Sequence, residues 1–141
     1  RMLSITNTIP DAYAKIKGNE KCPDVKGTVS FYGVHCGTIV VTEVTGLSRQ
    51  SGNMSSTFHG FHIHEGEHYN PTNMKHPNHV GDLPPLMANH GIVFSVFYTE
   101  RFYPEDVLGK TIVIHEKPDD FRTQPSGDSG EMIAFGKIIR E

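Results

Sequence analysis

Apolar and polar residues alternate in short runs along most of the chain, and glycine, asparagine or proline separates one run from the next. Residues 12–17 alternate until Gly18 and Asn19 end the run. Because a strand turns successive side chains to opposite faces, this period of two predicts a half-buried β-strand. Similar runs, rich in β-branched and aromatic residues, predict further strands over 27–32, 38–44, 58–65, 93–98, 111–115 and 132–139, with a short run at 86–87.

Helical periodicity is weak throughout, apart from a single turn near Pro104. Short strands joined by turns, such as the tight turn that Asn89-His90-Gly91 predicts, indicate one all-β domain over residues 1–141, an antiparallel sandwich or barrel. Two long segments, 66–85 and 117–130, stay outside the strand pattern. Loops of this length are uncommon unless they have a function, and both begin just after a histidine at a strand end. We expect both to fold over one shared site.

The composition and the cysteines narrow the class of protein further. A net charge of −3 without a basic cluster argues against nucleic acid as a partner, and no apolar run approaches the ~20 residues of a membrane span. Cys22 and Cys36 fall at opposite ends of the predicted strand 27–32, roughly 25 Å apart at ~3.3 Å per residue. A disulfide joins Cα atoms only about 4.4–6.8 Å apart. We therefore expect free cysteines and a cytoplasmic protein, or an exported one if a leader has been removed.

Histidine is abundant, with nine residues in a chain of 141. His62 and His64 alternate on the predicted strand 58–65, so their imidazoles point to the same face. Neutral imidazole is the commonest protein ligand for zinc and copper. Further candidate ligands follow at His68, His76, His79, Asp82 and His115. These are too many for one tetrahedral ion, so the sequence predicts more than one metal site.

Two sites divide the candidates better than one. An all-imidazole set of His62, His64 and His115 suits copper, whereas the mixed set of His76, His79 and Asp82 suits zinc. His68 lies between the two sets in sequence and could serve either. Of the remaining histidines, we expect a buried, hydrogen-bonded His59 and two solvated turn residues, His35 and His90.

Four blocks in order resemble the signature of the copper–zinc superoxide dismutases: Gly60-Phe-His-Ile-His-Glu65, His68-Tyr-Asn-Pro71, His79-Val-Gly-Asp-Leu83 and Val113-Ile-His-Glu-Lys-Pro-Asp-Asp120. The resemblance covers the chain from about Asp11 to Ile139, and Asp82-Leu-Pro-Pro85 is most similar to the bacterial branch. It implies a flattened eight-stranded Greek-key antiparallel barrel with two long functional loops. It also implies an enzyme that converts superoxide to dioxygen and hydrogen peroxide.

The resemblance further implies a role for each candidate ligand. Copper would be held by His62, His64, His68 and His115, and zinc by His68, His76, His79 and Asp82. His68 would bridge the two ions and supply the proton that peroxide formation needs. Asp119 matches an aspartate that binds neither metal but hydrogen-bonds ligands of both sites. A ligating histidine is generally oriented in this way, through its other ring nitrogen.

Three features depart from the family pattern. Only three residues separate His64 from His68, where the family carries a longer subloop with a cysteine, and Phe135 stands at the position of that cysteine's partner. Met132 stands where the family places a cation beside the copper channel. We therefore expect reduced steering of the anionic substrate, unless Lys117 or Arg122 supplies the charge. Because the subloop contributes to many family dimers, we expect a monomer or an atypical homodimer.

Two other functions fit parts of this pattern. A dismutase-like protein could bind copper and zinc for buffering or delivery without catalysis, since complete ligands and a missing channel cation suit both. A zinc hydrolase or lyase could use His62, His64 and a distant third histidine as an open site. The second alternative would leave the zinc set and the match along the whole chain unexplained.

Overall fold

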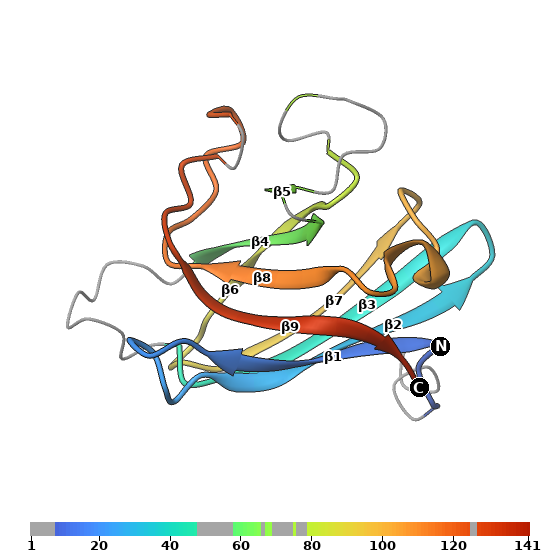
Figure 1. Cartoon of the computed structure of the whole chain (residues 1–141), viewed down its shortest axis with the longest axis horizontal. Coiled ribbons are helices and arrows are strands. Elements are labelled where there is room, and N and C mark those ends of the chain that lie inside the picture. The colour runs from blue at the N-terminus through green and yellow to red at the C-terminus, as the bar shows by residue number, and fades with distance from the viewer. Residues whose placement is uncertain (1–7, 48–57, 66, 69–74, 76–78, 125–126) are drawn as a thin grey trace.

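The computed structural model of the chain describes residues 8–47, 58–65, 67–68, 75, 79–124 and 127–141. They form an all-β fold, drawn in Figure 1, with a single 3₁₀ turn. The elements are, in chain order, β1 (Ala12–Gly18), β2 (Lys26–Val34), β3 (Gly37–Thr45), β4 (Phe58–Glu65), β5 (Glu67–His68), β6 (Asp82–Met87), β7 (Val93–Thr99), η1 (Pro104–Val107), β8 (Thr111–His115) and β9 (Met132–Arg140).

All strand pairs among the described residues are antiparallel, and the strands follow one another in the order β5-β4-β8-β9-β1-β2-β3-β7. β6 also pairs with β4, on the same edge as β5 and away from β8. The neighbours β4–β8, β9–β1 and β3–β7 are distant in sequence, as Greek-key connections require. The sheet curls into a nearly closed barrel, which confirms the predicted fold class. It stays open between β6 and β7, and we refer to this opening as the seam.

The barrel core is built from the inward residues of each strand. Phe61 and Ile63 of β4 pack with Ile112 and Ile114 of β8, and all four are fully buried. In the ladder Phe61 lies opposite Ile114 and Ile63 opposite Ile112. The alternation that predicted these strands therefore fills the core with one face of β4 and leaves the other face for His62 and His64.

The structure corrects the sequence prediction at β6. We expected a loop until Pro85 and only a short run at 86–87, whereas β6 begins at Asp82. Pro84 and Pro85 concealed the strand, because proline is disfavoured in a sheet unless its missing N–H faces an unpaired edge. Successive strand residues direct their backbone nitrogens to opposite sides, so only one of these prolines faces the open seam. The other faces β4 at the irregularity in the β4–β6 register between His59 and Phe61. The two-residue strand β5 is also new, since two residues are too short to show a period.

Two other predictions, the free cysteines and the tight turn at Asn89-His90-Gly91, are confirmed. Cys22 and Cys36 are both free, the former buried and the latter exposed. His90 and Gly91 have positive φ angles of 53° and 80° in the tight turn before β7, as such hairpin turns require. Within the described residues, no helix is long and apolar enough to cross a membrane.

Candidate metal centre

Three histidines converge on the outer face of the barrel, near the end of β4. His62 and His64 come from β4, and His115 is the last residue of the neighbouring strand β8. Their potential ligand atoms all lie within 4.8 Å of one another. The ring centroids of His62 and His115 are 4.8 Å apart, and those of His64 and His115 are 5.7 Å apart. Of the three, His62 and His115 are buried.

The loop that follows β8 rises from the end of that strand in Figure 1, and two of its residues orient two of the rings. Nε2 of His62 donates a hydrogen bond to Oδ2 of Asp119 over 2.9 Å. Nδ1 of His115 donates to the backbone carbonyl of Gly130 over 3.1 Å. These bonds place a proton on one nitrogen of each ring, so that Nδ1 of His62 and Nε2 of His115 are the nitrogens suited to bind a metal.

The cluster fits a metal ion. With metal–nitrogen bonds of about 2 Å, ligand atoms on opposite sides of an ion lie ~4 Å apart. The potential ligand nitrogens of the three histidines all lie within 4.8 Å of one another. Small side-chain movements would therefore bring all three onto one ion. Ligation by imidazole alone suits copper, as it also suits zinc, iron and nickel.

His59 supports the centre from inside the barrel, as a buried and hydrogen-bonded histidine should. It is 3% exposed, and its Nδ1 donates to the backbone carbonyl of His115 over 2.9 Å. Burial lowers its pKa below the ordinary value, because the protonated ring would lose its hydration. His35 and His90 are exposed turn residues, as predicted.

A second pair of candidate ligands lies at the start of β6. Nδ1 of His79 is 3.2 Å from Oδ2 of Asp82, and both side chains are almost fully buried. Two ligands of one tetrahedral zinc ion at about 2.0–2.2 Å lie ~3.3–3.5 Å apart. The pair thus has the spacing of half a zinc site. His76, the third member of the predicted set, lies outside the described residues.

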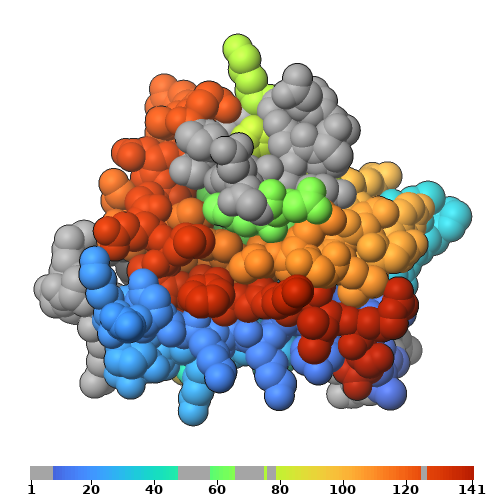
Figure 2. Space-filling view, in the orientation of Figure 1, coloured from blue at the N-terminus to red at the C-terminus, as the bar shows by residue number. Residues whose placement is uncertain are grey.

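The structure describes His68 by its backbone alone. In the β4–β5 ladder, His68 lies directly opposite His64 and Glu67 opposite Glu65. The chain therefore turns back onto β4 within a few residues of His64. A chain with a longer subloop would not have to turn back so soon. The end of β4 and β5 (green) and the loop after β8 (orange to red) lie at the same end of the molecule in Figure 2.

Met132 begins β9 directly opposite His115 in the β8–β9 ladder, next to an irregularity in the register. Its side chain is 48% exposed. Of the two cations proposed to replace the family's channel charge, Lys117 pairs with Asp128 over 3.7 Å, and Arg122 is exposed in the loop.

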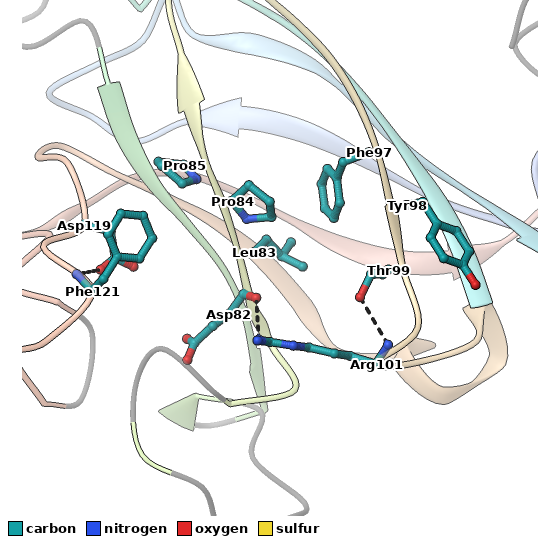
Figure 3. Close-up of a pocket in the computed structure, with 10 residues that line it drawn as sticks. All are labelled: Asp82, Leu83, Pro84, Pro85, Phe97, Tyr98, Thr99, Arg101, Asp119 and Phe121. Carbon is teal, nitrogen blue, oxygen red and sulfur yellow. Dashed lines mark hydrogen bonds between the residues drawn. The ribbon is translucent and has the colours of Figure 1, made fainter. Parts of the chain in front are cut away.

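Arg101 is a site residue that the sequence analysis missed. Its Nη1 donates to the backbone carbonyls of His79 and Asp82 over 2.9 and 3.1 Å. Figure 3 shows Arg101 reaching from the end of β7 along a groove of about 400 Å³ at the seam, which Asp119 and Phe121 also line. An isolated arginine in a turn gives no sequence signal for such a role.

An antiparallel β-barrel that carries buried histidines on its outer face, with an aspartate behind one of them, defines a metal-binding barrel protein. Comparison with known proteins identifies the class. The model of the family described as copper/zinc superoxide dismutase (SODC) matches residues 25–138. The chain belongs to this family, and its enzyme class and its cofactors, copper and zinc, are those of the family.

Individual relatives agree with the family match. An extracellular Cu-Zn superoxide dismutase of Drosophila melanogaster is 33% identical over 141 aligned positions, which cover 81% of this chain and 75% of the relative. Superoxide dismutase [Cu-Zn] 3 of Arabidopsis thaliana is 32% identical, with 90% and 88% covered. Superoxide dismutase [Cu-Zn] A of Xenopus laevis is 32% identical, with 82% and 89% covered.

Proposed function

We propose that this chain is a superoxide dismutase that converts two superoxide ions and two protons into dioxygen and hydrogen peroxide. The observation that carries the proposal is the convergence of His62, His64 and His115 within 4.8 Å on a barrel of this family. When bound, copper supplies the one-electron redox chemistry of the conversion, and zinc supplies charge and structural support.

The proposed ligand sets are those expected from the family resemblance: His62, His64, His68 and His115 for copper, and His68, His76, His79 and Asp82 for zinc. The register of His68 opposite His64 supports its assignment between the two sites. In this proposal, a ring nitrogen of His68 holds the proton that is passed on to the forming peroxide. Asp119 and the Gly130 carbonyl keep His62 and His115 in the tautomers that bind copper.

We further propose that the chain attracts superoxide less strongly than relatives that have a cation at position 132. The exposed Met132 side chain is neutral and stands across the ladder from His115. Lys117, a possible substitute, has the acidic Asp128 as its neighbour, which offsets its charge.

The short segment after His64 supports a compact variant of the family. The fly alignment runs over 141 positions but takes in only 81% of this 141-residue chain, so the relative has residues with no counterpart here. We propose that the missing subloop is among them and that the chain is a monomer or an atypical homodimer, which light scattering in solution would test. The similarity to the bacterial branch of the family and the cytoplasmic location stay predictions.

Metal content and superoxide consumption, measured on one preparation, test the proposed function. We expect one copper and one zinc per chain and a rate proportional to bound copper. His115→Ala should lose the activity together with the copper, and His68→Ala should weaken both sites. A fully loaded chain that does not consume superoxide would instead be the non-enzymatic copper and zinc binder, which the neutral Met132 also allows.

A further inference from the structure

The turn that joins His79 to Asp82 is held by its own hydrogen bonds and by two residues outside it. The Ile63 amide of β4 donates to the Gly81 carbonyl over 2.8 Å, and Arg101 binds the two ends. The Asp82 amide donates to the His79 carbonyl over 3.0 Å, and the His79 amide donates to Oδ2 of Asp82 over 2.9 Å. A single nitrogen of Arg101 then bridges the carbonyls of these same two residues. The guanidinium therefore binds the turn at both of its ends.

Arg101 is itself anchored on the far side of the seam. Its backbone amide donates to Oγ1 of Thr99, the last residue of β7, over 3.1 Å (Figure 3). β6 forms its ladder with β4, and Pro84 and Pro85 have no N–H to offer β7. The hydrogen bonds of Arg101 thus connect β7 to the turn across an opening that the sheet does not close.

We propose that Arg101 is a positioning residue for the zinc site, which fixes the backbone from which His79 and Asp82 project. The inference rests on the proposed assignment of these two residues as zinc ligands. Ligand groups held in place before binding lose less conformational freedom when the ion arrives, so the bridge should raise zinc affinity.

Removing Arg101 should change the zinc affinity in opposite directions, depending on whether the residue acts through its charge or by positioning the backbone. A guanidinium close to a dication repels it, so an arginine that acted through its charge alone would weaken zinc binding. An arginine that acts through the two carbonyls strengthens zinc binding instead. The sign of the change on removing Arg101 therefore separates the two roles.

The experiment measures zinc affinity by competition with a chromogenic chelator in the full-length chain. Substitutions of partners behind metal ligands commonly cost 10–100-fold in affinity, and we expect Arg101→Ala to weaken zinc binding about tenfold. Arg101→Lys, which keeps the charge and can still donate, should lose less. Arg140→Ala, which removes an exposed arginine at the end of β9, is the matched control and should leave the affinity unchanged.

Cobalt(II) in the zinc site gives a second readout, since the intensity of its visible bands reports how tetrahedral the ligands are. We expect weaker, shifted bands in Arg101→Ala, while copper affinity stays unchanged. Equal or tighter zinc binding in Arg101→Ala overturns the proposal. If Arg101→Ala does not fold, the comparison of Arg101→Lys with the wild-type chain decides in the same way, and a loss in affinity supports the proposal.

These outcomes are separate from those of the dismutase activity. A chain that binds zinc in an Arg101-dependent way but leaves superoxide unreacted refutes the enzyme and keeps the positioning role. A chain that consumes superoxide and binds zinc equally well with or without Arg101 refutes the positioning role and keeps the enzyme. A wild-type chain that takes up no zinc overturns the inference together with the zinc assignment.

Discussion

Asp119 and His62 form a buried hydrogen bond of 2.9 Å between side chains that are 1% and 0% exposed. Oδ1 of the same carboxylate accepts from the Phe121 amide over 2.7 Å, so the loop backbone holds the aspartate in place. A buried carboxylate facing an imidazole fixes both the ring's orientation and its proton, and it makes the opposite nitrogen a better ligand. The loop after β8 thereby acts on a proposed copper ligand without supplying one.

We predict that Asp119→Ala lowers copper affinity roughly tenfold, at the low end of the 10–100-fold effect of removing such a partner. Asp119→Asn should lose less, because its amide oxygen can still accept from His62. Competition with a copper chelator measures both values. Unchanged copper affinity in Asp119→Ala would mean that packing alone holds the His62 ring.

Met132→Arg tests the steering of superoxide. A cation beside the copper channel should raise the bimolecular rate about tenfold, at the low end of electrostatic steering. The rate should also fall more steeply with salt, because salt screens the added charge. Pulse radiolysis over a range of ionic strengths measures both effects, with copper content checked in each sample.

The native chain does not need that cation if another residue already supplies the charge. A native rate near the diffusion limit, or no gain in fully loaded Met132→Arg, would show this. Arg122→Ala would then be the next measurement, and we would expect it to slow the native enzyme.

We predict that reductant leaves the melting temperature nearly unchanged, because Cys22 and Cys36 are both free. A chelator should lower the melting temperature strongly, since ions bound by the folded state alone stabilise it by mass action. Calorimetry with each reagent makes the comparison. A large decrease with reductant while the metals stay bound would refute the prediction.

Asp120 makes the free energy of unfolding of the metal-free chain depend on pH in the acidic range. Hydrogen bonds from Thr123, by hydroxyl and amide, and from the Arg122 amide lower its pKa from the usual 3.8 to about 2. Because the folded-state pKa is the lower one, the stabilisation is complete above pH ~4 and is lost as the pH falls towards 2. Asp120→Asn should therefore be less stable at pH 7 and lose less stability on acidification. Urea unfolding between pH 7 and 2 measures this, with Asp24→Asn as the control.

The strands and the common face of His62 and His64 could be predicted from the sequence because both depend on local periods. The alternation in 58–65 puts Phe61 and Ile63 in the core and so fixes the face of His62 and His64. That His115 would join them follows from the β4–β8 ladder, a pairing between strands far apart in sequence. The sequence analysis grouped His115 with them by its imidazole alone, since no local pattern could show that the two strands pair.

Features that depend on tertiary contacts could not be predicted from the sequence. β6 was missed because proline is tolerated in a strand only at an unpaired edge or at an irregularity in the ladder, and both exist only once the barrel is formed. The role of Arg101 needs the seam to bring β7 beside the 79–82 turn. The partner of His115 is the backbone carbonyl of Gly130, and a backbone carbonyl gives no side-chain signal in the sequence.

Anomalous X-ray scattering at the copper and zinc absorption edges, from crystals of the loaded chain, tests the two-metal account most directly. We predict a copper peak among His62, His64 and His115 and a separate zinc peak beside His79 and Asp82. A single shared site, or no metal beside His79 and Asp82, would contradict the account.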